Sequence, residues 1–409
     1  MIAINPFQSQ CAMTYLICTI VCWRHQQDIQ YYGGWYKVGK TNISGEIMKN
    51  YEINNFRSKS ICDMHIHSHV EMPLNETLDI YKKIMQHFNY EKIVLEALPY
   101  YDITENFKVL YLKSKLDGIY ANIGLTHSFN EKDTQEGYLE QIKLFYDMGC
   151  DGIKMFEGKP EYRKKLGRPL NDKIFDKFYA FAEEKGLPIV MHVSDPREFW
   201  DKERIPQWAL ERGWFYGEEF VPFETVQKEI EGVLKKFPKL KLIFAHFFFV
   251  SDDISYADWI MNKWENTCFD LTPGTEMYNN FSDNIDEWRN FFKRNSSRIL
   301  FGTDIYNWEK GDNTIEERYA HAVNLVRNFL ERKEPFIDKW QNKKIENPFG
   351  FEDEILDNIY YNNFVRIFGK QRREIDCDLI KSECKRFIKN HNLNELETAN
   401  MQKIIDSFR

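Results

Sequence analysis

The feature that most constrains the fold of this chain is a regular alternation of short apolar runs with amphipathic segments, which begins near residue 61. The apolar runs are rich in Val, Ile and Phe and mostly do not alternate with polar residues, as expected for strands that are buried on both faces. The eight runs are Ser60–His65, Lys92–Leu98, Ile119–Thr126, Gly152–Phe156, Pro188–His192, Lys241–His246, Thr267–Leu271 and Arg298–Asp304.

Segments with helical periodicity lie between these runs, for example Glu76–Phe88, Gly137–Gly149, Asn171–Gly186 and Thr225–Phe237. Asp304 follows His65 by 239 residues, so each of the seven strand–helix steps takes about 34 residues, close to the size of a βαβ unit. Eight such units in roughly 250 residues are typical of a closed barrel and not of a doubly wound sheet. We therefore predict an α/β fold, a (β/α)8 TIM barrel with additional C-terminal helices.

The chain is expected to have three parts. Residues 61–369 form the barrel, and residues 370–409 form a charged helical tail that packs outside it or against a partner subunit, which makes a homodimer a hypothesis. Residues 1–60 form an N-terminal segment whose 13-residue apolar run, Cys11–Trp23, is too short to span a bilayer. We interpret this run either as a buried segment or as residues that precede a natural start at Met48.

Composition excludes several classes of protein. With 43% hydrophobic residues in a chain of 409, a large core can form, which excludes a disordered protein. The net charge is −8 and no basic patch dominates, so we expect no nucleic-acid partner and no membrane partner, but a small-molecule substrate. Eight scattered cysteines without a CxxC pair indicate a reducing, cytoplasmic location.

The sharpest local motif is Asp63-Met-His65-Ile-His67. Residues two positions apart on a strand point to the same side, so His65 and His67 can share one metal ion. An HxH motif alone is weak evidence, because it often occurs by chance.

Three further residues at predicted strand ends strengthen this interpretation. His192 ends the fifth predicted strand, His246 the sixth and Asp304 the eighth. The carboxyl ends of barrel strands meet at one face, where active sites lie. Imidazoles and a carboxylate around an open position indicate a catalytic metal site, in which the pKa of a bound water falls to about 7.

The chain resembles the amidohydrolase superfamily, and within it the amidohydrolase-2 branch of metal-dependent barrel enzymes, from about His65 to Gly369. The motifs that carry the resemblance are DMHIH at 63–67, GIKMF at 152–156, MHVSDPREFW at 191–200, WFYGEEFVPFE at 214–224, KLIFAHF at 241–247 and ILFGTD at 299–304.

This resemblance implies roles for five residues. His65, His67 and His192 would ligate one divalent metal, and Asp304 would complete the site and act as general base. His246 would bond to the water or polarise the substrate. We expect zinc, with manganese, iron or cobalt as alternatives that the same ligands accept.

Lys154, in the fourth predicted strand, has three interpretations. In binuclear relatives a lysine at this position is carboxylated and bridges two metals, although the branch resembled is usually mononuclear. It can instead stay cationic and bind a substrate carboxylate, or pair with Glu96 or Glu157 across the barrel.

The substrate-binding candidates follow strands four, five and eight. Arg163 is a candidate carboxylate clamp or part of a solvated face, and Arg197 can grip an anion or pair with Asp195. The aromatic insertion Arg197–Glu219 is expected to overhang the site. Within and beyond it, we predict lid and wall positions for Trp200, Trp214, Tyr306 and Trp308.

These features lead to one main function and two alternatives. The main prediction is a metal-dependent hydrolase that attacks an amide, lactone or ester-like bond with activated water. The same branch contains nonoxidative decarboxylases of aromatic or unsaturated acids, which a basic carboxylate clamp would favour. An inactive ligand-binding barrel is a further alternative, but the complete set of ligating residues argues against it.

Overall fold

The structure is a computed structural model, and it describes residues 59–68, 72–129, 132–274, 276–306, 315–339 and 341–408. The apolar run Cys11–Trp23, the alternative start Met48 and the wall candidate Trp308 lie outside the described residues. Among the helices that are described, none combines the length and the apolar character needed to cross a bilayer.

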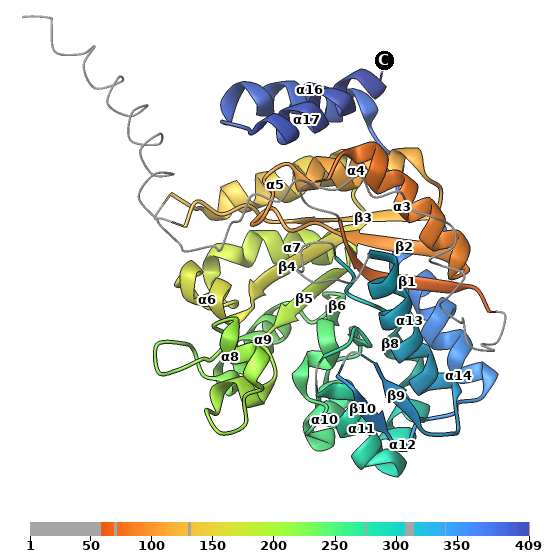
Figure 1. Cartoon of the computed structure of the whole chain (residues 1–409). Helices are drawn as coiled ribbons and strands as arrows, with labels where there is room; N and C mark the ends of the chain where they lie inside the picture. Colours follow the sequence, from red (N-terminus) through yellow and green to blue (C-terminus); the bar gives the residue numbers. More distant parts are fainter. Residues whose placement is uncertain are drawn as a thin grey trace, which may run out of the picture. The chain divides into compact units, whose positions relative to one another are not determined.

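Eight parallel strands form one sheet, and each strand pairs with the next one in the sequence. This order confirms the predicted (β/α)8 barrel, with helices between the strands (Figure 1). The strands are β1 (Ile61–His67), β2 (Tyr90–Glu96), β3 (Ile119–Gly124), β4 (Gly152–Gly158), β5 (Ile189–Val193), β6 (Leu242–Phe244), β7 (Thr267–Asp270) and β8 (Ile299–Leu300).

Backbone hydrogen bonds between β1 and the chain at and beyond β8 bring the first and last strands together. Met64 N–H donates to the carbonyl of Phe301 at 3.0 Å, and His67 N–H donates to the carbonyl of Ile305 at 3.0 Å. Ile66 and Ile305 form an isolated parallel bridge. The end of β1 and the segment that carries Asp304 therefore lie side by side.

Local signals in the sequence explain where some of the barrel helices begin and end. Thr134 caps α5 by accepting a hydrogen bond from Gly137 N–H, and Gly186 ends α7 in a left-handed conformation. The barrel helices are α3 (Leu74–His87), α4 (Glu105–Lys115), α5 (Gln135–Asp147), α6 (Pro160–Leu166), α7 (Asp176–Lys185), α9 (Phe223–Lys236), α10 (Ile254–Lys263), α11 (Met277–Asp283), α12 (Ile285–Asn295) and α13 (Ile315–Glu331).

The strand boundaries differ from the predicted ones by a few residues, and three of the differences concern the site. β1 continues to His67, and β8 is paired only over Ile299–Leu300, because the chain beyond it bonds to β1 through irregular contacts. β6 ends at Phe244, before His246, because a left-handed turn replaces the last residues of the predicted strand.

Side chains inside the barrel form two layers. The lower layer is apolar and is closed at the amino ends of the strands by Phe364, Ile367 and Phe368 of α15 (Asn363–Phe368). Its strand residues are Cys62, Met64, Val94, Tyr120, Val190, Ile243, Cys268 and Leu300. Residues two positions further along a strand face the same way, so the next layer is largely polar and contains Glu96, Asn122, Lys154, His192 and Asp270.

The insertion after β5 has a small core of its own. It contains η3 (Arg197–Trp200) and α8 (Gln207–Glu211). Phe199, Ala209 and Tyr216 are buried together, with Trp200 and Trp214 packed against them.

The predicted helical tail consists of α16 (Cys377–Asn390) and α17 (Glu395–Ser407), which pack against each other and against α4 (Figure 1). Asn400 accepts a hydrogen bond from Leu74 N–H at 3.2 Å and donates one to the carbonyl of Met72 at 3.2 Å. The tail therefore packs on the outer helices of its own barrel, and a homodimer stays a prediction.

We expect Phe364→Ala to lower the free energy of unfolding by about 3–5 kcal/mol, because Phe364 is almost fully buried among the lower-layer side chains. Urea unfolding followed by circular dichroism measures this loss. Tyr361→Ala is the control, since this side chain is only partly buried at the edge of the same cluster. A loss for Phe364→Ala no larger than that of the control would contradict the assignment of α15 as the plug.

Candidate metal centre

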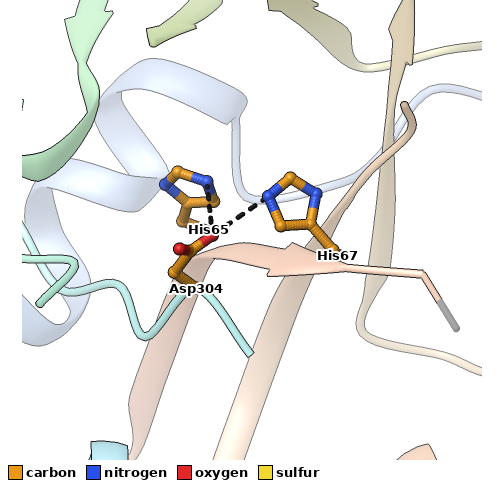
Figure 2. A group of neighbouring side chains, drawn as sticks. All are labelled: His65, His67 and Asp304. Atoms are coloured by element: carbon orange, nitrogen blue, oxygen red, sulfur yellow. Dashed lines mark ion pairs between the residues drawn. The ribbon is translucent and has the colours of Figure 1, made fainter. Parts of the chain in front are cut away.

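Three side chains converge at the carboxyl end of the barrel. His65 Nε2 lies 3.4 Å and His67 Nε2 lies 3.0 Å from Oδ1 of Asp304 (Figure 2). One donor atom from each residue lies within 4.8 Å of the other two, which allows them to hold one metal ion. Two imidazole nitrogens and a carboxylate oxygen are a ligand set that suits zinc and related divalent ions.

A distortion of β1 allows both histidines to face inward. The register of β1 with β2 shifts between Asp63 and Ile66. Asp63 Oδ1 accepts a hydrogen bond from His65 N–H at 3.1 Å, so the strand has a local bulge at this point. As a result Met64 belongs to the apolar core, while His65 and His67 reach the layer above it.

Asp63 also supports the segment that carries Asp304. Its Oδ2 accepts hydrogen bonds from the hydroxyls of Tyr90 at 2.9 Å and Thr303 at 2.7 Å. Burial raises the pKa of Asp63 to about 7. Since Thr303 precedes Asp304, one buried carboxyl group fixes the backbone next to two candidate ligands.

Asp304 is held in a strained conformation. Its φ is +56°, a left-handed conformation that is unfavourable for residues other than glycine. Asp304 N–H donates to the carbonyl of His65 at 2.8 Å. Gly302 is required nearby, because a β-carbon there would lie 2.6 Å from Oγ1 of Thr272 and 3.1 Å from Cβ of His65.

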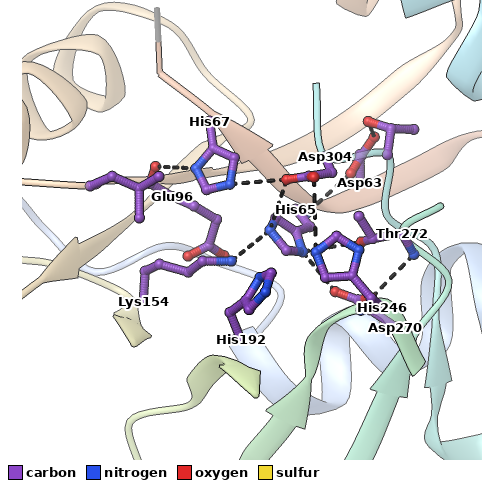
Figure 3. Close-up of polar contacts among 12 residues, drawn as sticks. Asp63, His65, His67, Glu96, Lys154, His192, His246, Asp270, Thr272 and Asp304 are labelled. Atoms are coloured by element: carbon purple, nitrogen blue, oxygen red, sulfur yellow. Dashed lines mark hydrogen bonds and ion pairs between the residues drawn. The ribbon is translucent and has the colours of Figure 1, made fainter. Parts of the chain in front are cut away.

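Hydrogen bonds to Nδ1 orient both imidazoles. His67 Nδ1–H donates to the carbonyl of Glu96 at 3.0 Å, and His65 Nδ1–H donates to Oδ2 of Asp270 at 2.7 Å (Figure 3). The proton on Nδ1 leaves Nε2 with a lone pair in each neutral ring. A metal-binding histidine usually has such a partner on its other nitrogen.

The approach of His67 to Asp304 is itself informative. A neutral His67 with its proton on Nδ1 has only a lone pair at Nε2, and a carboxylate oxygen also only accepts. Two acceptors 3.0 Å apart need a positive charge between them, which is either a second proton on His67 or a metal ion. The residues present therefore fit a divalent cation.

The electrostatic environment favours the ligand forms of these groups. Burial lowers the pKa of His65 well below its usual value and lowers that of His246 to about 4. Burial alone would raise the pKa of Asp304, but a proton on Nε2 of His67 and the charged forms of His65 and His246 lower it well below its usual range. Neutral imidazoles and an ionised carboxylate are the states that bind metals.

The side chain of Lys154 reaches into the site. Its Nζ lies 2.6 Å from Nε2 of His65, and its side chain is almost fully buried. Burial lowers its pKa, while the charge of Glu96 acts in the opposite direction. Glu157, one of its two predicted partners, instead bonds to His127 at 2.7 Å. The three interpretations of Lys154 stay predictions.

His246 and His192 lie beside the three converging residues. His246 Nε2 is 3.9 Å from Oδ2 of Asp304, and its buried Nδ1 has no hydrogen-bond partner. The ring of His192 is 4.9 Å from that of His246, and its Nε2–H donates to Oδ1 of Asp195 at 3.1 Å. The structure thus brings three of the four predicted ligands together, and ligation by His192 stays a prediction.

Protein carboxylates engage both candidate arginines. Arg163 forms two hydrogen bonds with the Glu229 carboxylate, at 3.0 and 2.8 Å. Arg197 pairs with Glu224 and, at 3.2 Å, with Asp252.

The aromatic candidates differ in their surroundings. Trp200 and Trp214 pack in the insertion's own core. Tyr306 lies next to the site, with its ring 6.4 Å from that of His67.

Sequence reasoning missed Asp270, which contacts His65 directly. The sequence did contain a signal. Asp270 lies near the end of the predicted strand Thr267–Leu271, and other site residues also lie at the ends of predicted strands. His127, outside the group, is a buried histidine that bonds to Tyr138 and Glu157.

The family model described as Amidohydrolase matches residues 62–370, which cover the whole barrel and α15. No protein of curated function matches the sequence.

Among solved structures, 4-oxalomesaconate hydratase from Rhodopseudomonas palustris is 15% identical, with a TM-score of 0.49, and the match covers 80% of this chain and 99% of that one. An uncharacterized TIM-barrel protein from Bordetella bronchiseptica is 14% identical, with a TM-score of 0.48 and coverage of 76% and 98%. A 2,6-dihydroxybenzoate decarboxylase from Rhizobium is 14% identical, with a TM-score of 0.45 and coverage of 76% and 98%.

We expect the purified protein to bind one equivalent of Zn(II) and His67→Ala to bind it at least about 100-fold more weakly, because one of the converging ligands is lost. Elemental analysis and titration against a chromophoric chelator measure this. His127→Gln is the matched control, since His127 is a buried, hydrogen-bonded histidine outside the group. Equal affinity in His67→Ala and the wild type would exclude this site.

Proposed function

Since this chain belongs to the amidohydrolase family, we propose that it is a metal-dependent hydrolase that cleaves an amide, lactone or ester-like bond with activated water. The observation that carries the proposal is the convergence of the Nε2 atoms of His65 and His67 on Asp304. Both rings are held by hydrogen bonds at Nδ1, as metal ligands usually are.

His65, His67 and Asp304 would hold the metal, with His192 as the proposed fourth ligand. Asp195 binds one nitrogen of His192 and leaves the other for this task. A divalent ion in such a site lowers the pKa of water to about 7, which supplies a nucleophile at neutral pH. We propose zinc, with manganese, iron or cobalt as alternatives.

The protein's own groups would move the proton and bind the substrate. Oδ2 of Asp304 faces His246 and is the proposed general base, which would then pass its proton to the leaving group. His246 is neutral near pH 7, because burial lowers its pKa to about 4, so it can donate one hydrogen bond to the substrate carbonyl. Tyr306 would form part of the wall beside His67.

A decarboxylase is the second candidate. A cationic clamp for the substrate carboxylate would favour it, but Arg163 and Arg197 are already paired with carboxylates of the protein. Lys154 is the cationic group closest to the candidate ligands, and it is nearly fully buried. These pairings favour the hydrolase.

Metal-loaded protein assayed on lactones, amides and aromatic acids in isotopically labelled water separates the two. A hydrolase incorporates 18O from water into the product carboxylate. A decarboxylase releases CO2 and takes up deuterium from D2O at carbon. Turnover that is unaffected by chelation and metal removal would contradict both.

We expect Asp304→Asn to lower kcat by about 10²–10⁴-fold on whichever substrate is found, because an amide cannot accept the proton. The fold is expected to persist, since Asn is nearly isosteric and keeps the backbone contact with His65. Steady-state kinetics with metal in excess measures the effect, and circular dichroism checks the fold. Asp117→Asn is the control, since Asp117 is an exposed partner of Arg372 outside the site. Wild-type kcat in Asp304→Asn would remove its role as base.

A further inference from the structure

We propose that Asp270 is a positioning residue that links the metal side of the site to His246, an inference that rests on the proposed function. Asp270 ends β7 and is completely buried. Its two oxygens contact different parts of the site. Oδ2 contacts the His65 imidazole, and Oδ1 accepts backbone N–H groups of the turns after β6 and β7. One carboxylate therefore connects β1 with the turns that follow β6 and β7 (Figure 3).

The first contact sets the tautomer of His65. Asp270 Oδ2 lies 2.7 Å from His65 Nδ1, and Oγ1 of Thr272 lies 3.1 Å from the same nitrogen. A carboxylate only accepts hydrogen bonds, so it keeps the proton on Nδ1 and the lone pair on Nε2. This is the state in which His65 can take part in the group with His67 and Asp304.

The second contact holds a strained turn. The four residues His246–Phe249 follow one another with φ between +53° and +59°, and none of them is glycine. Such a backbone persists only where its surroundings enforce it. Oδ1 of Asp270 accepts the N–H of His246 at 2.8 Å and that of Thr272 at 3.1 Å, so it binds the first residue of the left-handed run.

Packing secures the same turn from the other side. Phe247 is completely buried, and its ring lies 4.5 Å from that of Phe269 and 4.9 Å from that of Phe281. Phe269 precedes Asp270 on β7, so adjacent residues of one strand hold the ring of Phe247 and the amide of His246. This arrangement directs Nε2 of His246 toward Oδ2 of Asp304, 3.9 Å away.

Two substitutions separate these contacts. In Asp270→Asn the amide oxygen can still accept both backbone N–H groups, but the amide nitrogen donates toward His65 Nδ1 and favours the tautomer with the proton on Nε2. Asp270→Ala removes both contacts. The His65 contact is therefore tested by Asp270→Asn, and the His246 contact by the difference between the two variants.

For Asp270→Asn we expect a 10- to 100-fold weaker affinity for Zn(II), measured by chelator competition. In the metal-free protein, ¹⁵N NMR of the histidine rings should show His65 changing from the Nδ1–H to the Nε2–H tautomer. Unchanged affinity together with an unchanged tautomer would overturn the proposal. Because the tautomer is read without metal, this result stands even if the wild-type protein binds no Zn(II), which would refute the proposed function alone.

For Asp270→Ala we expect, in addition, shifted ring signals of His246 and a further fall in kcat of at least 10-fold at saturating metal, because the turn is released. Identical His246 signals and kcat in the two variants would overturn the link to His246. Asp151→Asn and Asp151→Ala are the matched controls. Asp151 is another buried aspartate that accepts a backbone N–H, from Ala121, and pairs with Lys113 at 2.7 Å, but it precedes β4 and lies outside the site. These variants measure the cost in stability of losing a buried carboxylate.

Discussion

Two hydrogen-bond acceptors, Nε2 of His67 and Oδ1 of Asp304, face each other at the mouth of the barrel and require a positive charge between them. His67 Nε2 and Asp304 Oδ1 lie 3.0 Å apart, although a neutral imidazole with its proton on Nδ1 and a carboxylate both accept hydrogen bonds. Nζ of Lys154 lies 2.6 Å from Nε2 of His65. A divalent cation bound by His65, His67 and Asp304 would supply this charge.

Backbone strain is concentrated where the strands deliver these groups. Ser194, the run His246–Phe249 and Asp304 all have positive φ and follow β5, β6 and β8. Left-handed backbone costs roughly 1–2 kcal/mol for each residue other than glycine, so several such residues on one face need strong support. Buried hydrogen bonds from Asp63 and Asp270 supply part of it. At the opposite end, which the apolar plug closes, Asn89 before β2 also has a positive φ, of +56°, so the strain is concentrated at the mouth but is not confined to it.

Charged side chains around the mouth show why residue type alone is a poor guide to substrate binding. Arg163 and Arg197 are positioned after strands whose ends form the site, but each has a protein carboxylate as its partner. Their partners, Glu229 and Glu224, lie on α9, far along the chain. An ion pair depends on which helix packs against the arginine. The sequence alone therefore cannot show whether an arginine pairs with a protein carboxylate or can bind a substrate.

The sequence by itself determined the barrel and predicted a site at the carboxyl ends of its strands. Burial on both faces makes each strand an apolar run, and the period of two places His65 and His67 on one side, so both features are local and readable. Only the tertiary structure decided which ring nitrogen of His65 and His67 faces the other ligands, and that Nε2 of His192 donates to Asp195. The reason is that His65 takes its tautomer from Asp270, more than two hundred residues away, through a hydrogen bond that exists only once the barrel has closed.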